Sequence, residues 1–278
     1  MIAVTGATGN VGGELVRALV GRGEGVRAVA RHPDPAALPD GVEVAAADLA
    51  EPGSFGPALD GARGLFLLGG FAAPDLLATS RAAGVDHVVL LTSRCVVGGR
   101  PDNAVTRMWL DAEAAVRASG LAWTILRPSG FHSNALRWLP QLRAGDVVRA
   151  PWPDVAIASI DPADIAAVAA VALTEPGHEG TAPAVSGPKP LVPADLVATL
   201  AEVLDRPLRY EPQGEEDARA GMAADMPAPF VDALFRFFSD GEFDDAPVLD
   251  TVLAVTGRKP RTFEEWALAH VSELTEGQ

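Results

Sequence analysis

The sequence contains little of several residue types on which particular chemistries depend. Among its 278 residues there is one cysteine, Cys95, which excludes an internal disulfide and any cysteine-rich zinc or iron–sulfur site. The five histidines show no metal-ligand spacing, so we predict no metal. Because nothing in this composition requires an oxidising compartment, we expect the protein in a reducing cytoplasm.

Long apolar runs and an excess of positive charge are also missing. No window reaches the roughly 20 uninterrupted apolar residues of a membrane span, and the N-terminus MIAVTGATG lacks the basic region of a signal peptide. The 37 acidic residues outnumber the 22 basic ones, and the resulting net charge of −15 repels phosphate backbones. We therefore expect neither a membrane nor a nucleic-acid partner. The sequence leaves the oligomeric state open.

What the chain does contain is an alternation of short apolar strands with alanine-rich helical segments. Strands that are apolar at every position and are separated by helices are typical of a parallel sheet covered on both faces. The predicted strands are 2–5, 26–30, 42–46, 64–68, 88–91 and 122–126, with a last one at 184–186. The predicted fold class is therefore α/β, with a doubly wound parallel (Rossmann) sheet.

The pattern changes after about residue 130, where loops, short helices and aromatic residues replace the regular alternation. We predict that residues 1–130 and 151–188 form the Rossmann domain. A smaller, mostly helical substrate-side domain is predicted for residues 131–150 and 189–278. Within it, the charged stretch 211–217 has no apolar period and is the most linker-like.

The clearest motif is a glycine-rich loop that directly follows the first strand and opens a helix, Gly6-Ala7-Thr8-Gly9-Asn10-Val11-Gly12. In such a loop the first glycine permits a tight turn, the second lets the backbone approach a pyrophosphate, and the third lets the helix pack closely on the sheet. The helix N-terminus adds free N–H groups and a positive dipole. This context favours a dinucleotide site over a purely structural turn.

The loop and several later segments resemble the NmrA-like branch of the atypical short-chain dehydrogenase/reductase superfamily. The later matches are Ala47-Asp48-Leu49, Leu67-Leu68-Gly69, Leu91-Thr92-Ser93, TILRPSGF over 124–131, DPADIA over 161–166 and TFEEW over 262–266. The similarity covers essentially the whole chain. It implies an NAD(P)H-dependent quinone reductase, another reductase, or a cofactor-sensing regulator without catalysis. It also implies that the cofactor is held by Gly6, Thr8, Gly9, Asn10, Val11, Arg31, Asp48, Leu49, Leu68, Gly69 and Thr92.

Arg31 bears on which dinucleotide binds. It follows the second strand, where an enzyme that prefers NAD usually places an acidic residue for the ribose 2′-hydroxyl. A guanidinium there can bind a 2′-phosphate, so we expect NADP(H), although an arginine that is merely solvated would leave the preference open. Asp48, which the resemblance places near the adenine, could instead cap the next helix.

The residues that typical members of the superfamily use for proton transfer are missing. Those enzymes use Tyr-x-x-x-Lys, whereas this chain has one tyrosine, at position 210, and two lysines, at positions 189 and 259. Two candidate proton donors remain. Ser93 ends a central strand, where open α/β sheets bind ligands, and His132 belongs to a segment that lines the pocket in the family. Either could equally be a structural side chain, and water could protonate a quinone-like product.

The expected substrate is a small molecule, aromatic or quinone-like. Trp109, Phe131, Asn134 and Trp138 are predicted to line its pocket, although aromatic residues at such spacing often belong to a core. The leading hypothesis is an NAD(P)H-dependent oxidoreductase that reduces a small carbonyl or quinone-like compound. The alternatives are a non-catalytic NADP(H)-sensing regulator and a non-redox cyclase or isomerase on the same fold.

Overall fold

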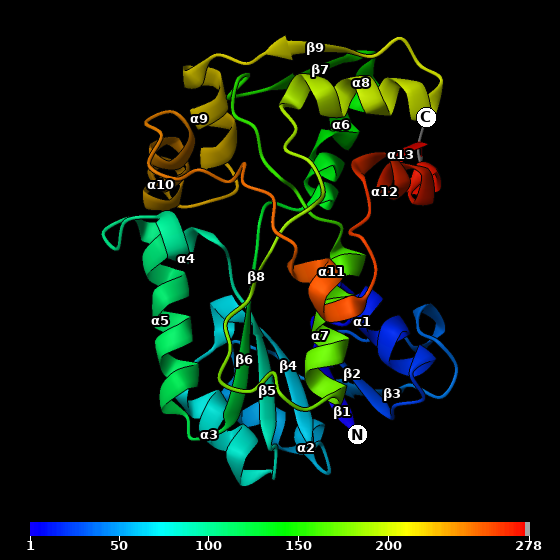
Figure 1. The fold of residues 1–278 in the computed structure, drawn as a ribbon, viewed down its shortest axis with the longest axis vertical. Helices are drawn as coiled ribbons and strands as arrows, with labels where there is room; N and C mark the ends of the chain where they lie inside the picture. Colours follow the sequence, from blue (N-terminus) through cyan, green and yellow to red (C-terminus); the bar gives the residue numbers. More distant parts are fainter. Residues whose placement is uncertain (276–278) are drawn as a thin grey trace.

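The structure is a computed structural model that describes residues 1–275. Its main element is a seven-stranded parallel sheet with the strand order β3-β2-β1-β4-β5-β6-β8 (Figure 1). The strands are β1 (Ile2–Thr5), β2 (Val26–Ala30), β3 (Glu43–Ala46), β4 (Gly64–Leu68), β5 (His87–Leu91), β6 (Ala122–Pro128) and β8 (Ala184–Val185). The strand order reverses between β1 and β4, and open α/β sheets bind ligands at such a point. The predicted fold class is confirmed.

Helices cover both faces of this sheet, and each face has its own apolar core. On one face lie α1 (Asn10–Gly21) and α7 (Pro162–Thr174), which pack against each other. On the other face lie α2 (Phe55–Leu59), α3 (Pro74–Ala82) and α5 (Ala104–Ala118). Because both faces are buried, the central strands are apolar on successive residues rather than on alternate ones.

A second lobe lies over the carboxyl ends of the strands (Figure 1). It contains a two-stranded parallel sheet of β7 (Val147–Ala150) and β9 (Arg209–Pro212) and a separate apolar core. Its helices are α6 (Leu139–Ala144), α8 (Pro193–Leu204), α9 (Glu215–Ala223), α10 (Ala228–Phe238), α12 (Phe263–Ala269) and α13 (Val271–Thr275). One later helix, α11 (Thr251–Thr256), returns to the first lobe and packs on α7.

The prediction of a linker at residues 211–217 is wrong. Residues 211–212 complete β9, and α9 begins at Glu215. The two four-residue strands pair only with each other, at the register Val147↔Arg209, across about sixty residues of chain. Local hydrophobic periodicity does not show a pairing between such short and distant segments.

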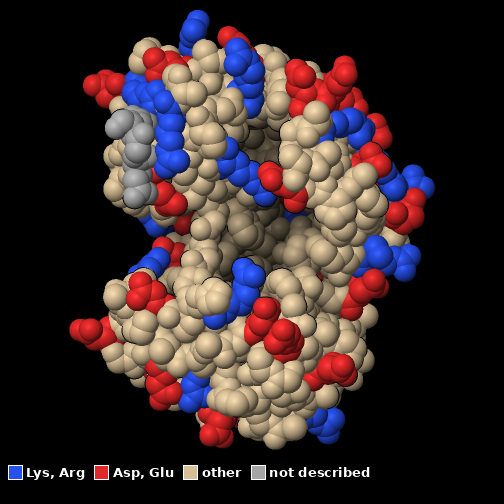
Figure 2. All heavy atoms as spheres, turned by 180° about the vertical axis from the view of Figure 1, so that it is seen from behind, with Lys and Arg blue, Asp and Glu red and all other residues tan. Residues whose placement is uncertain are grey.

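The molecule is deeply hollowed between the two lobes, and charged side chains of both signs lie along the rims of this cleft (Figure 2). The carboxyl ends of β1, β4, β5 and β6 point toward the cleft from below (Figure 1). Within the described residues, no helix has the length and apolar character needed to cross a bilayer.

Candidate functional site

The glycine loop uses its glycines for two different purposes. Gly6 has a φ of +62°, and a Cβ there would lie 2.7 Å from Leu68 Cδ1; a Cβ on Gly12 would lie 2.1 Å from the Gly6 carbonyl oxygen. These two positions are therefore required by the packing of the loop. Gly9 is exposed and immediately precedes α1, and no side chain caps this helix. The first N–H groups of α1 are thus open, which is what a bound pyrophosphate requires.

The other residues expected around the adenosine end lie near the loop with different degrees of exposure. Thr8 and Asn10 are exposed, whereas Val11 is buried in the core beneath them. Arg31 is exposed at the end of β2, with no hydrogen bond or ion pair in the described part of the chain. The Asp48 carboxylate accepts the N–H of Ala50 at 2.9 Å, so it already closes a local turn. Leu49 is half-buried beside it.

The ends of β4 and β5 form the floor of the cleft. Gly69 follows the half-buried Leu68, and a Cβ on it would lie 2.3 Å from the Leu91 carbonyl oxygen and 2.7 Å from the Trp109 ring. The Trp109 ring therefore packs against the backbone at this edge, and its role as a wall of the substrate pocket stays a prediction. Thr92 is buried, and its hydroxyl donates to the Leu126 carbonyl oxygen at 3.2 Å. The backbone N–H of Thr92 also donates to the Leu126 carbonyl oxygen, at 2.8 Å, so both groups are engaged inside the protein.

Beneath this floor lies a buried ionic network that the sequence analysis missed. Glu113 of α5 accepts two hydrogen bonds from Arg127 at 2.8 and 2.6 Å, one from Arg117 at 3.2 Å and one from the Thr92 hydroxyl at 3.3 Å. Burial alone would raise the pKa of Glu113, but the hydrogen bonds and charges of the two arginines outweigh it and hold the pKa below its usual value. The network fixes α5 to the end of β6.

The two candidate proton donors have very different surroundings. Ser93 is half-buried at the carboxyl end of β5, where its oxygen accepts the N–H of Cys95 at 3.3 Å and its hydroxyl also forms a hydrogen bond with the Cys95 side chain. His132 is 2% exposed. Its Nδ1 lies 3.0 Å from Ser159 Oγ and its Nε2 lies 3.4 Å from the Arg261 carbonyl oxygen, and its ring meets Phe263 edge-on.

These contacts correct the expectation for His132. Burial lowers its pKa to about 4, so the ring is neutral near pH 7, and both ring nitrogens are already engaged inside the protein. This is the environment of a packing residue and not of a group that donates a proton to a substrate. The single thiol is equally unsuited to chemistry, because burial raises the pKa of Cys95 to about 11.

The predicted substrate-pocket residues of the segment after β6 do not all face the same way. This segment forms a 3₁₀ helix, His132–Trp138, in which every third residue shares a face. Asn134 is exposed, and its Nδ2 would be 3.9 Å from a Cβ on Gly130. Phe131 is half-buried and packs against the core of the first lobe, whereas Trp138 packs into the core of the second lobe. Trp138 is therefore half-buried against the core of the second lobe.

A second network missing from the sequence analysis lies where β5 and β6 end. The Arg94 guanidinium, whose side chain is 10% exposed, lies 3.3 Å from the carboxylate of Asp245, which is also buried. The other carboxylate oxygen of Asp245 accepts the N–H of Gly130 at 3.0 Å. Burial raises the pKa of Asp245, although the Gly130 N–H and Arg94 act against that shift. Asp245 is 115 residues from Gly130 in the chain, so no local signal predicts the contact.

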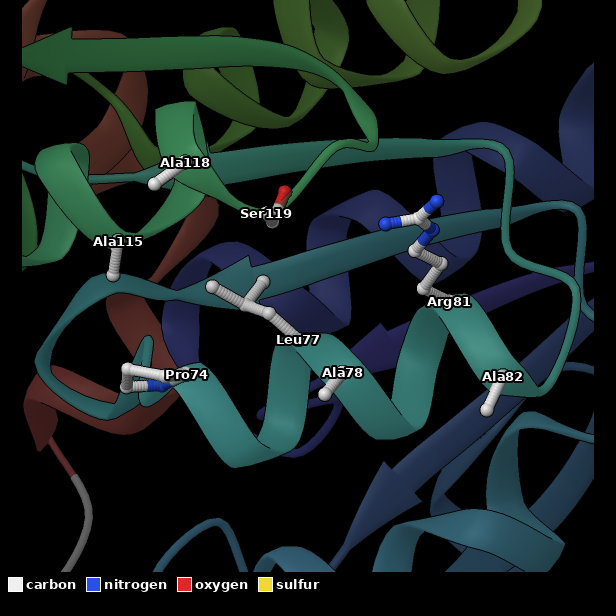
Figure 3. Close-up of a pocket in the computed structure, with 8 residues that line it drawn as sticks. All are labelled: Pro74, Leu77, Ala78, Arg81, Ala82, Ala115, Ala118 and Ser119. Atoms are coloured by element: carbon white, nitrogen blue, oxygen red, sulfur yellow. The ribbon is translucent and has the colours of Figure 1, made fainter.

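One cavity on the surface lies away from this site. It is an open groove of about 560 Å³ between α3 and α5, lined by residues such as Leu77, Arg81 and Ser119 (Figure 3). A smaller cavity of about 250 Å³ borders the glycine loop, the 3₁₀ helix and the start of α7. Within residues 1–275, no group of three or more metal-binding side chains gathers, and the absence of metal stays a prediction.

The doubly wound sheet, the open helix terminus after β1 and the cleft above the strand ends define a dinucleotide-binding α/β protein. A family model described as NAD(P)H-binding matches residues 6–176. The chain belongs to this NAD(P)H-binding family. It shares its fold with NmrA, on which it superposes with a TM-score of 0.72 at 19% identity, covering 96% of this chain and 94% of that one.

Known reductases are similar to this chain over almost its whole length. It is 40% identical over 276 residues to the (4-alkanoyl-5-oxo-2,5-dihydrofuran-3-yl)methyl phosphate reductase of Streptomyces griseus, covering 97% of this chain and 98% of that protein. It is 37% identical over 285 residues to the NAD(P)H azoreductase of Xenophilus azovorans, covering 98% of each. The NADPH-dependent quinone oxidoreductase QOR2 of Escherichia coli superposes with a TM-score of 0.78 at 26% identity, covering 98% of this chain and 99% of that one. The chain is an NAD(P)H-dependent reductase.

Proposed function

We propose that this reductase acts on a small, electron-poor conjugated compound, such as a quinone or an α,β-unsaturated carbonyl compound. The observation that carries the proposal is the position of the open α1 terminus at the strand ends beside the Trp109 wall. That arrangement fits a dinucleotide whose nicotinamide lies in the cleft beside a flat apolar surface. The similar proteins from Streptomyces, Xenophilus and Escherichia reduce a butenolide phosphate, azo compounds and quinones by their names, and these compounds are all electron-poor π systems.

The bound cofactor supplies a hydride, and the chain's own residues bind, orient and shield the reactants. Gly9 and the first N–H groups of α1 hold the pyrophosphate, while the exposed Arg31 offers its guanidinium to the 2′-phosphate of NADPH. Trp109 and Phe131 provide apolar walls that limit the access of water. The proposed proton source for the reduced product is the half-buried Ser93 hydroxyl at the end of β5, with water as the second source.

Two measurements test the proposal separately. Fluorescence titration measures NADPH binding, and loss of the reduced-nicotinamide absorbance measures turnover with a panel of quinones, azo dyes and unsaturated lactones. We expect NADPH binding together with steady oxidation by at least one quinone or unsaturated carbonyl compound. NADPH binding without oxidation by any member of the panel would overturn the proposed substrate class. It would then favour the cofactor-sensing or non-redox alternatives.

A further inference from the structure

Arg94 is a charged residue whose burial needs an explanation. It follows Ser93 directly at the carboxyl end of β5, and its backbone N–H donates to the Pro128 carbonyl oxygen at 2.9 Å. Its side chain retains 10% of its accessible surface. Burying a guanidinium is costly unless its charge is paired and its N–H groups are bonded. The position lies in the crevice where sheets of this type bind their reactants.

Among residues 1–275, one nitrogen of the guanidinium makes all of its contacts with polar groups of the protein. Nη1 donates to Ser129 Oγ at 3.1 Å and to the Pro247 carbonyl oxygen at 2.9 Å, and it lies 3.3 Å from Asp245 Oδ1. Asp245 is itself held, because it accepts the Gly130 N–H. The segment 239–250, which joins α10 to α11 (Figure 1), thus fixes the orientation of the guanidinium.

The other edge of the guanidinium has no protein partner in the described residues. Within residues 1–275, the enclosed side-chain atoms without a hydrogen bond are Thr106 Oγ1, Asp161 Oδ2, Asp245 Oδ1 and Trp266 Nε1. Nε and Nη2 of Arg94 have no hydrogen-bond partner in the described residues, and they do not belong to this enclosed set. Both nitrogens are therefore accessible to solvent. Together they carry three N–H groups in a fixed plane. The structure thus offers a rigid, positively charged donor edge directly after the carboxyl end of β5.

We propose that this free edge of Arg94 binds the carbonyl oxygen of the substrate and stabilises the negative charge that develops there. This inference rests on the proposed function and specifies its substrate as a conjugated carbonyl compound. A hydride adds to the electron-poor carbon, the π electrons shift along the conjugated system, and the carbonyl oxygen becomes an enolate or phenolate oxygen. One proton from Ser93 or water completes the product, with the oxidised dinucleotide as the second product.

Arg94 then performs part of the task for which typical members of the superfamily use tyrosine and lysine. An arginine does not give up its proton in proteins, so it acts through charge and hydrogen bonding alone. Donors oriented in advance toward a developing oxyanion are worth about a hundredfold to a thousandfold in turnover. The anchoring by Asp245 supplies that orientation, because it fixes the guanidinium plane before the substrate arrives.

The test uses the purified full-length chain and a double variant, Arg94→Met with Asp245→Asn, which removes both charges of the pair and leaves neither unpaired. Arg94→Lys keeps the positive charge but lacks the planar donor edge. If the double variant does not fold, Arg94→Lys is the variant compared with the wild type. Arg100→Met is the control, because Arg100 is a nearby arginine with a 71% exposed side chain. NADPH affinity is measured first for every variant.

Binding of 4-nitrophenol gives a readout that does not depend on turnover. Wild-type protein and Arg100→Met should bind the coloured phenolate in preference to the neutral phenol, and thereby lower the apparent pKa of the bound probe. The double variant should lose this preference, and Arg94→Lys should keep only part of it. With the substrate found in the panel, kcat/KM should fall about a hundredfold or more in the double variant at unchanged NADPH affinity.

Two results would overturn the role of Arg94. One is wild-type protein that shows no preference for the phenolate. The other is a double variant, or Arg94→Lys, that retains both the phenolate preference and kcat/KM of the wild type. Failure of the proposed function is a different observation, because in that case the wild type binds NADPH but oxidises it with no conjugated carbonyl compound.

Discussion

Replacing His132 separates a packing role from a catalytic role. His132 is 2% exposed and is hydrogen-bonded at both ring nitrogens, and burial lowers its pKa from 6.5 to about 4. The unfolded chain therefore binds more protons than the folded protein between these two values. Folding stability is unaffected by this residue above about pH 6.5, and it falls as the pH falls through this window.

The size of the effect follows from the two pKa values. Moving from pH 7.5 to pH 5 should lower the free energy of unfolding of the wild-type protein by about 2 kcal/mol through His132 alone. Below pH 4 this decrease reaches its limit of about 3 kcal/mol. His132→Asn removes the titrating ring while keeping a polar group near Ser159. The variant should be less stable than the wild type at pH 7.5, because it loses packing against Phe263. On moving to pH 5, however, its free energy of unfolding should fall by about 2 kcal/mol less than that of the wild type.

The assay is denaturant unfolding of both proteins at pH 7.5 and pH 5, with His32→Asn as the control, because His32 is exposed. Buried carboxyl groups such as Asp161 and Asp164 contribute to the pH dependence of all the proteins and cancel in the comparison. Equal pH dependence in the wild type and His132→Asn would refute the reasoning. So would a kcat/KM that falls as the pH rises through about 6.5 in the wild type and loses this limb in His132→Asn at unchanged NADPH affinity.

Three further predictions concern the cofactor and the ionic network below it. NADPH should bind at least about tenfold more tightly than NADH, because one charge-assisted bond from Arg31 to the 2′-phosphate supplies roughly 1.4 kcal/mol. Arg31→Ala should abolish most of this difference. Equal affinities of the wild-type protein for the two cofactors in a titration would contradict this prediction. Gly9→Val should keep the fold, as judged by circular dichroism, but should lose cofactor binding, because the valine side chain occupies the space of the pyrophosphate. If this variant binds the cofactor with wild-type affinity, the glycine loop is not the pyrophosphate site. Glu113→Ala should lower the free energy of unfolding by about 3 kcal/mol, because it leaves Arg127 without its buried partner. The exposed Glu264→Ala should change it by less than about 0.5 kcal/mol, and a similar small effect at Glu113 would argue against the network.

The sequence by itself determined the Rossmann sheet and the dinucleotide site. Strands with consecutive apolar residues, such as residues 65–68 of β4, are stable only when both faces of a sheet are covered, and this condition is visible along the chain. The glycine loop is equally local, since Gly6, Gly9 and Gly12 lie within seven residues and their spacing follows from one strand–turn–helix unit.

Only the tertiary structure decided which polar residues can meet a substrate. His132 and Ser93 looked equivalent as candidates, but the packing of Phe263 and Arg261 from the far end of the chain encloses the histidine, whereas Ser93 stays half-buried. Likewise, the pairing of Arg94 with Asp245 joins residues 151 positions apart. Burial and charge pairing depend on contacts between distant segments, and these contacts leave no periodic trace in the sequence.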